Sequence, residues 1–393
     1  MECQSCPAVT VLQWKSGSDS WEHNWPSTNK LQEDVVYKCE EVFPQEAQIC
    51  LTLANATKIR ACHNCRSSLT EVFKIPEIWW SDFCQNSNGC LGSEVTRHEG
   101  TITGFNTWAS FEIKQLDAAM QYEWYKVTVF IRWVVATNQT IILAFDTKSP
   151  VAEYILDALQ HPDLSHINDP FWVYARLASN VVVRFQDTAV WAIRNQVRAI
   201  ETEKKPMGRP YPDYRRLHDI ARHAIHVSET LDVATDTMEG ILAQHENFLN
   251  KDVVFMSRPS MNQTHDRLTF SKNVIGNLRH RAASNRKRLQ NEIQLAYNTV
   301  SQYDSEVSVR IGRAAQTDSA AMKTVAFLTM TFLPATFLSA IFSMSFFNYS
   351  ADIDSWNVSN KLWIYWAFAI PTTLGTFTLW HFWHKIFPPD LIE

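Results

Sequence analysis

The sequence predicts an α/β N-terminal domain, a long α-helical stalk and two C-terminal transmembrane helices. Residues 324–350 and residues 362–380 contain no charged side chain, which is typical of membrane spans. β-Branched and aromatic residues dominate residues 125–145, a pattern that predicts a β-hairpin. A heptad pattern begins at Leu289 and indicates a helix that packs lengthwise against other helices.

The overall composition excludes several classes of protein. The net charge is −5 at pH 7, so a nucleic-acid partner is not expected. The N-terminal sequence Met-Glu-Cys-Gln-Ser-Cys has neither a basic nor an apolar region, so we expect no cleaved secretory signal. We find no glycine-rich phosphate loop, nucleophile elbow or HExxH pattern, and therefore expect neither enzymatic activity nor a bound cofactor.

Residues 1–100 form a Cys-rich region that contains all eight cysteines. Two CxxC pairs, Cys3 with Cys6 and Cys62 with Cys65, could supply four thiolates to a tetrahedral zinc ion. The pairs are 56 residues apart (6 to 62), which is far outside zinc-ribbon spacing. Free thiols in a reducing compartment are the favoured interpretation.

Residues 101–203 are expected to form the α/β cytosolic domain. Alternating apolar and polar residues, and then two β-branched runs, predict strands, whereas the apolar period becomes helical after Pro150. Three prolines and a glycine at 204–212 predict a linker. The expected elements are strands at 107–114, 125–136 and 140–145 with a turn at 137–139, then helices at 151–160 and 170–203.

The helical stalk is expected at residues 213–323. An amphipathic pattern predicts a first helix at 217–249, and Arg258-Pro259-Ser260 interrupts it. The next helix, from about residue 264, has no proline before Pro334, which predicts a helix of about 80 residues and roughly 120 Å. Such a helix needs neighbours along its apolar face, and both the first helix and symmetry-related copies could provide them. That face consists of Leu289, Ile293, Ala296, Val300, Tyr303 and Val307, spaced 4, 3, 4, 3 and 4 residues apart.

The two spans are predicted at residues 324–347 and 362–384, with an external loop at 348–361. Each has about the 20 apolar residues that a hydrocarbon core requires. Arginine and lysine precede the first span and lysine follows the second, so the positive-inside rule places both termini in the cytosol. We expect a multi-pass membrane protein, with the plasma membrane as the favoured location.

The first span carries hydroxyl side chains along its length, whereas the second is aromatic. Hydroxyl groups favour helix partners or water over lipid, although a serine or threonine can also bond to its own helix. The first span is therefore predicted to line a pore and the second to face lipid. The hydroxyl-bearing residues are Thr329, Thr331, Thr336, Ser339, Ser343 and Ser345, with Pro334 among them.

This arrangement resembles the CorA family of magnesium channels. The match is closest at residues 319–347, where Met322-Lys323 opens the span and Pro334-x-Thr336 lies in its middle, as in the family's pore segment. The family's Gly-Met-Asn is replaced by Ser343-Met344-Ser345. The chain is similar to divergent members of a fungal type.

The resemblance implies a homo-oligomer, pentameric by the family pattern, that conducts Mg²⁺ or another divalent cation, which would also be the regulatory ion. It implies a pore lined by residues of the first span, with membrane lipid around the second. Asp352 and Asp354 would attract cations to the outer mouth. The implied pore-lining residues are Met322, Val325, Thr329, Thr336, Ser343, Met344 and Ser345.

Two alternatives remain at this point. The loss of Gly-Met-Asn favours a membrane-anchored pseudo-channel that does not transport and instead binds a partner or senses an ion. The histidines and cysteines allow a zinc transporter of the same fold.

Two further groups of polar residues are interpreted as solvated. His223 and His226 are neighbours on the first stalk helix and could share a metal, but an exposed helix face is the favoured interpretation. Asp169 precedes Pro170 in a stretch of loop-forming residues, so we expect it in a solvated loop.

Overall fold

The computed structural model describes residues 10–15, 22–23, 47–54, 56–117, 121–145, 150–160, 168–203, 208–250, 258–342, 347–350 and 354–386. The chain divides into two compact units, Met1–Tyr297 and Asn298–Glu393.

The first unit is built on a seven-stranded sheet with the order β2-β1-β3-β7-β6-β5-β4. β3 and β7 are parallel, and every other neighbouring pair is antiparallel. β1 to β4 come from the Cys-rich region, so this sheet includes strands from both sides of residue 100, where the sequence suggested a domain boundary. The strands are β1 (Thr10–Lys15), β2 (Glu22–His23), β3 (Ala47–Ala54), β4 (Gly89–His98), β5 (Thr101–Leu116), β6 (Tyr122–Val134) and β7 (Gln139–Phe145).

The predicted hairpin is confirmed as β6 and β7, and its turn contains Asn138. This residue has a φ of 52°, a left-handed conformation that asparagine tolerates better than most residues. Its side-chain oxygen accepts a hydrogen bond from the indole of Trp133 at 3.0 Å. The turn is therefore tied to the strand that precedes it.

The helices of the first unit occupy most of the remaining described chain. A π-helical turn (Ala178–Val182) separates α7 from α8. Pro259 lies in the first turn of α10, where its missing N–H costs no hydrogen bond, so α10 begins earlier than expected. The helices are α3 (Ala56–Ala61), α4 (His63–Phe73), α5 (Asp82–Asn86), α6 (Val151–Leu159), α7 (Trp172–Leu177), α8 (Val183–Thr202), α9 (Tyr214–Leu249) and α10 (Arg258–Phe342).

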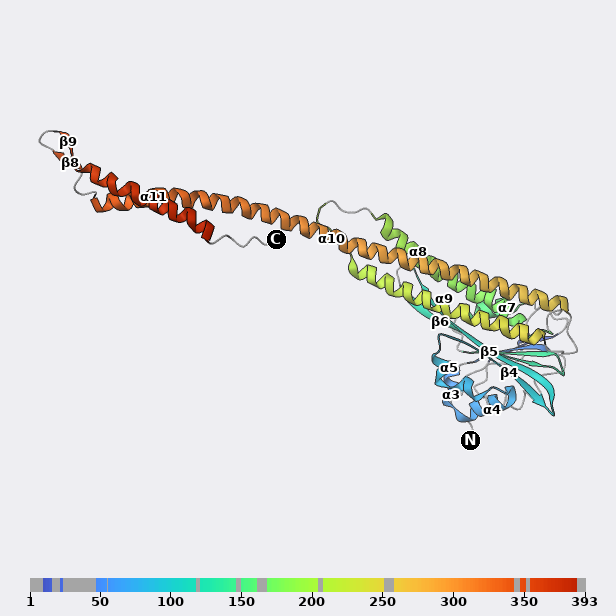
Figure 1. Ribbon diagram of the computed structural model, residues 1–393. Helices are drawn as coiled ribbons and strands as arrows, with labels where there is room; N and C mark the ends of the chain where they lie inside the picture. The colour runs from blue at the N-terminus through green and yellow to red at the C-terminus, as the bar shows by residue number, and fades with distance from the viewer. Residues whose placement is uncertain are drawn as a thin grey trace. The chain divides into compact units, whose positions relative to one another are not determined.

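Both faces of the sheet are buried. Ile49 and Leu51 of β3 belong to one apolar core, while Cys50 between them belongs to another. Successive side chains of a strand point to opposite faces, so the two cores lie on opposite sides of the sheet. Helices α8, α9 and α10 cover one face, and α3, α4 and α5 lie on the other (Figure 1).

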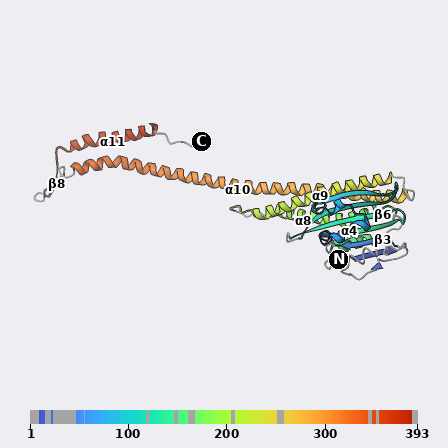
Figure 2. The same cartoon turned by 90° about the horizontal axis from the view of Figure 1, so that it is seen from below.

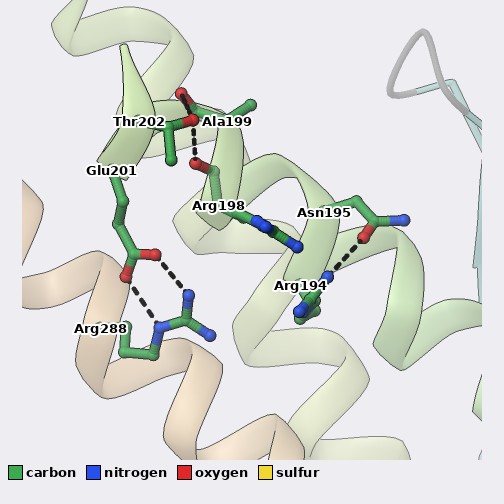
Figure 3. Close-up of polar contacts among 7 residues, drawn as sticks. All are labelled: Arg194, Asn195, Arg198, Ala199, Glu201, Thr202 and Arg288. Carbon is green, nitrogen blue, oxygen red and sulfur yellow. Dashed lines mark hydrogen bonds and ion pairs between the residues drawn. The ribbon is translucent and has the colours of Figure 1, made fainter.

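Helices α8 and α10 are joined by a polar contact at the surface of the first unit (Figure 3). The guanidinium of Arg288 on α10 donates two hydrogen bonds to the carboxylate of Glu201 on α8. This contact lowers the pKa of Glu201. Paired, fork-shaped contacts of this kind fix the orientation of two helices better than a single ion pair does.

A buried Asp–His pair joins α9 to the residues before α7. Asp169 and His245 are both 0% exposed, and His245 Nε2 lies 3.0 Å from Asp169 Oδ2. Asp169 Oδ1 accepts a hydrogen bond from the backbone N–H of Phe171 at 3.0 Å. His265 of α10 completes the chain, with its Nδ1 3.4 Å from His245 Nδ1. The expectation that Asp169 lies in a solvated loop is wrong, because its side chain is fully buried. The sequence pattern did not reveal this, since its partner His245 is 76 residues away.

The second unit contains the end of α10, a two-stranded hairpin and α11 (Leu362–Ile386). The hairpin consists of β8 (Phe347–Ser350) and β9 (Ser355–Val358), which pair antiparallel within the loop region between the two apolar helices. This hairpin was not predicted. α11 lies beside the C-terminal part of α10 in both views (Figures 1 and 2).

The first prediction concerns Gly92 on the edge strand β4. A Cβ there would lie 2.1 Å from the indole of Trp108, its cross-strand partner. We expect Gly92→Ala to lower the free energy of unfolding by about 1–3 kcal/mol through overpacking. Thermal unfolding of the purified protein measures the change. In the control Gly276→Ala the new Cβ meets no atom within 4 Å, so an equal loss in both variants would contradict the prediction.

The second prediction concerns His245. The change His245→Leu leaves the buried carboxylate of Asp169 without its imidazole partner. We expect a loss of about 3–5 kcal/mol in unfolding free energy, the usual cost of breaking a buried pair. Arg310→Gln breaks the exposed pair with Glu306 and should cost about 0.3–0.5 kcal/mol. Comparable unfolding midpoints for the two variants would refute the prediction.

Candidate functional site

Two helices are long and apolar enough to cross a membrane. One candidate lies within residues 262–340 of α10 and the other within residues 362–382 of α11. Only 6% of each apolar segment is buried inside the chain. A core helix of a soluble protein would be mostly buried, so these apolar surfaces require lipid or another protein copy as a partner.

The C-terminal part of α10 and α11 pack antiparallel. The rings of Phe327 and Phe377 meet edge to face, with 5.3 Å between their centroids. Eight residues further along α10, the carbonyl of Ala335 accepts a hydrogen bond from the hydroxyl of Tyr365 at 3.1 Å. A tyrosine hydroxyl inside hydrocarbon must find such an acceptor within the protein. One aromatic contact and one hydrogen bond therefore join the two helices at two positions along their length.

The hydroxyl groups of α10 bond to their own helix. Thr329 donates to the carbonyl of Val325 at 2.8 Å, and Thr336 donates to that of Phe332 at 2.9 Å. Thr331 donates to Phe327 at 2.8 Å, and Ser339 donates to Thr336 at 2.9 Å. Each hydroxyl hydrogen is thereby used, and the oxygen lone pairs are left for other partners.

The predicted pore-lining residues that the structure describes share one exposed face of α10. Successive helix residues are rotated by about 100°, so Met322, Val325, Thr329 and Thr336 fall within an arc of about 60°. All four are exposed, Met322 by 70% and Val325 by 63%. Phe327, which contacts α11, lies on the opposite side of the helix, and Ala335, whose carbonyl also contacts α11, lies about 80–140° away from the four. We call this exposed face of four residues the hydroxyl face.

Thr331 occupies a different position from the other two threonines. It is rotated by about 140–160° from Thr329 and Thr336, toward the side of α10 that faces α11. Its side chain is half-buried, whereas those of Thr329 and Thr336 are exposed. The hydroxyls of the first span therefore do not all lie on one face of α10. The sequence pattern alone could not show which face contacts α11.

Several predicted residues lie outside the described part of the chain. Ser343, Met344 and Ser345 fall between α10 and β8, and Asp352 falls between β8 and β9. Asp354 is described and precedes β9 with a φ of 40°, so it forms part of the hairpin turn. The roles assigned to these five residues stay predictions.

The zinc hypothesis finds little support in the described residues. Cys3 and Cys6 lie outside them, and Cys65 is disulfide-bonded, so it holds no thiolate for a metal. The expectation of a free thiol does not hold for Cys65. Among the residues that the structure describes, no group of three or more His, Cys, Asp or Glu side chains could hold a metal ion.

The apolar face of the stalk continues into the second unit. Leu289 is buried, and Ile293 and Ala296 pack against the core of the first unit. Val300 and Val307, further along the heptad pattern, are half-buried between exposed residues. Val309 and Ile311 beyond them are exposed, so this part of α10 also presents apolar surface without a neighbour in the described chain.

No known protein-family profile matches the chain. A curated relative, notoamide biosynthesis cluster protein M' of Aspergillus versicolor, is 32% identical over 285 residues. The match covers 68% of this chain and 61% of the relative, so the chain spans less than two thirds of that protein's length.

The full-length CmaX protein has a similar structure, with a TM-score of 0.50 over 97% of this chain and 98% of that chain. The identity is 14%, so the likeness concerns the fold alone. The predicted architecture, an α/β domain followed by a long helical stalk and two C-terminal apolar helices, is confirmed.

Two CorA structures from Methanocaldococcus jannaschii also align. The complete magnesium transporter gives a TM-score of 0.39 at 9% identity over 95% of this chain and 96% of that chain. The soluble domain gives 0.46 at 8% identity over 75% of this chain and 98% of that chain.

The third prediction concerns the contact between the two apolar helices. Tyr365→Phe removes the hydroxyl that bonds the Ala335 carbonyl but keeps the ring. We expect a loss of about 0.6 kcal/mol, the average for such bonds between membrane helices. Thermal unfolding in detergent measures it. Trp363→Phe, at an exposed position of the same helix, is the control, and an unchanged midpoint for Tyr365→Phe would contradict the contact.

Proposed function

We propose that this chain is a subunit of a divalent-cation channel or transporter, with Mg²⁺ as the favoured ion and the end of α10 as the pore wall. The observation that carries the proposal is the hydroxyl face. It is exposed and turned away from the helix that packs against α10. A lipid-facing surface has no need of such hydroxyls, whereas a pore wall does.

The hydroxyl geometry favours a hydrated cation. The oxygens of Thr329 and Thr336 have donated their hydrogens to the helix and can only accept further hydrogen bonds. The water molecules around Mg²⁺ point their hydrogens outward, and Mg²⁺ gives up these waters reluctantly. An acceptor-lined wall therefore suits the hydrated ion.

Met322 and Val325 would form the cytosolic constriction. They lie at the start of the first span on the same face as the threonines. Apolar rings of this kind can close a pore by excluding water. Ser343, Met344 and Ser345 would form the outer mouth, and Asp352 and Asp354 would attract cations to it.

A pore of this type requires several copies of the chain. The two apolar helices bury only 6% of their apolar segments within one chain, and Val309 and Ile311 of the stalk are also exposed. A symmetric homo-oligomer with the hydroxyl faces turned inward would cover these surfaces. Five copies are proposed from the family resemblance, with both termini in the cytosol and α11 toward lipid.

A non-transporting, membrane-anchored protein is the second candidate. The observation that favours it is the replacement of Gly-Met-Asn by Ser-Met-Ser at residues 343–345. A serine hydroxyl reaches less far toward a pore axis than an asparagine amide does. A zinc transporter of the same fold is a third candidate, and flux measurements with each ion separate the three.

The fourth prediction compares two threonines of α10. Thr336→Val removes an exposed hydroxyl at nearly constant volume, in every subunit of the oligomer. We expect Mg²⁺ flux into proteoliposomes to fall about three- to tenfold, which corresponds to about 0.6–1.4 kcal/mol in the barrier. Thr331→Val removes a similar hydroxyl on the side facing α11 and should leave the flux within about twofold of wild type.

Three outcomes of this experiment are decisive. A selective loss in Thr336→Val supports the proposed pore wall. Equal losses in the two variants would mean that α10 is turned differently. If the wild-type oligomer conducts neither Mg²⁺ nor Zn²⁺ nor another divalent cation, the transport proposal fails and the anchored protein remains.

A further inference from the structure

The ammonium group of Lys114 is buried among aromatic rings without a carboxylate. Lys114 lies on β5 and is 2% exposed. Its Nζ lies 4.2 Å from the ring centroid of Tyr122 and 4.9 Å from that of Trp124, both on β6. The same Nζ lies 2.7 Å from Nδ1 of His226 on α9. Among the described residues, no ion pair to Lys114 is formed.

A second buried polar group borders the same rings. His223 precedes His226 by three residues on α9 and is 4% exposed. Its Nδ1 is buried and has no hydrogen-bond partner among the described residues. Its ring centroid lies 5.2 Å from that of Tyr122. Lys114 and His223 therefore approach one aromatic side chain from two different elements.

Two carboxylates near this cluster already have hydrogen-bond partners. Asp219 accepts from Arg222 at 2.8 Å, and Glu229 accepts from the side chain of Asn88 at 2.7 Å. Between the two strands, residues 118–120 are Ala-Ala-Met and carry no charge, and the carboxylate of Asp117 before them accepts a hydrogen bond from the backbone N–H of Gln121 at 2.8 Å. The titratable and charged groups around the cluster are Glu112 and Lys114 on β5, Tyr122, Glu123 and Lys126 on β6, and Asp219, Arg222, His223, His226 and Glu229 on α9.

The positive charge of Lys114 acts on both histidines. Burial, followed by the charges of Lys114 and Arg222, lowers the pKa of His223 to about 4. Burial and Lys114 also lower the pKa of His226. Burial and Arg222 lower the pKa of Lys114 itself. Lys114 and Arg222 thus oppose the protonation of both histidines.

A buried ammonium without an opposite charge is unfavourable. Contacts with the faces of Tyr122 and Trp124 offset part of this cost, since aromatic rings attract cations. An anion would offset more of it and would also supply an acceptor for a protonated His223. A metal ion fits this cluster poorly, because it would lie beside a lysine ammonium.

We propose that Lys114, His223 and His226 form a binding site for a small oxyanion, a phosphate or carboxylate group. Lys114 and His223 form the buried floor of this site. Its outer side is formed by Tyr122, which is 56% exposed, and by the exposed guanidinium of Arg222. The site lies in the first unit and does not depend on the transport proposal.

Binding at this site must be linked to proton uptake. An anion beside the imidazoles raises their pKa, so the bound state holds more protons than the free state. The affinity therefore rises as the pH falls toward about 4, the pKa of His223 in the free protein, by at most about tenfold per pH unit for one linked proton. Phosphate itself takes up a proton near neutral pH, so the comparison is made with acetate above about pH 5.5, where acetate stays ionised and a site that used the lysine alone would show no such dependence.

The experiment is isothermal titration calorimetry of the full-length protein in detergent at constant ionic strength. Inorganic phosphate and acetate are the two probes, and chloride controls for simple screening. We expect wild type to bind at least one oxyanion, and Lys114→Met to bind it at least about tenfold less tightly. The matched control is Lys272→Met, which removes a more exposed lysine paired with Glu239 and should leave the affinity unchanged.

The two probes and a histidine variant sharpen the result. Binding of phosphate without acetate identifies a phosphate site, and the reverse identifies a carboxylate site. His223→Gln should flatten the pH dependence while retaining part of the affinity. If Lys114→Met does not fold, the loss of the pH dependence in His223→Gln still supports the proposal, and an unchanged dependence overturns it. Absence of binding to wild type, or equal binding by folded Lys114→Met, also overturns it.

Discussion

Burial of both sheet faces is the constraint on which the first unit depends. Because side chains alternate along a strand, a strand such as β3 sends Ile49 and Leu51 into one core and Cys50 into the other. Two separate helical covers are then required. α9 and α10 provide one of them, and α10 contributes Leu268, Ile275 and Leu289 to it. The same helix later becomes the first apolar span, so the packing that protects the sheet also holds the beginning of the proposed pore helix.

Local patterns were enough to predict much of this fold. The β-branched residues at 125–145, the uncharged runs and the heptad pattern correspond to β6 and β7, to the two apolar helices and to the packed part of α10. Pairings between distant segments were not predictable, because no local pattern records them. The parallel pairing of β3 with β7 joins residues about 90 positions apart, such as Ile49 with Thr140. Asp169 was misinterpreted for the same reason, since flanking prolines are visible in the sequence and its distant partner His245 is not.

The candidate sites, like the fold, could be predicted from the sequence only in part. Helical spacing alone places Thr329 and Thr336 on one face, but only the position of α11 shows that this face is uncovered and that Thr331 is not part of it. Spacing also pairs His223 with His226. It could not reveal Lys114, which comes from a strand 112 residues before His226 and changes the chemistry from a possible metal pair to a cationic cluster. Side chains brought together by a sheet and a helix leave no joint pattern in either segment.

The hydrogen bonds that Thr329 and Thr336 make to their own helix have a consequence for the sign of charge in the proposed pore. An anion in a narrow passage needs hydrogen-bond donors to replace its hydration shell, and these two hydroxyls have no hydrogen left to offer. Chloride would therefore meet only hydrogen-bond acceptors at Thr329 and at Thr336. Such a wall would discriminate between cations and anions without any ionised side chain, so this preference would be insensitive to pH and would not be removed by the salt screening that weakens charged rings.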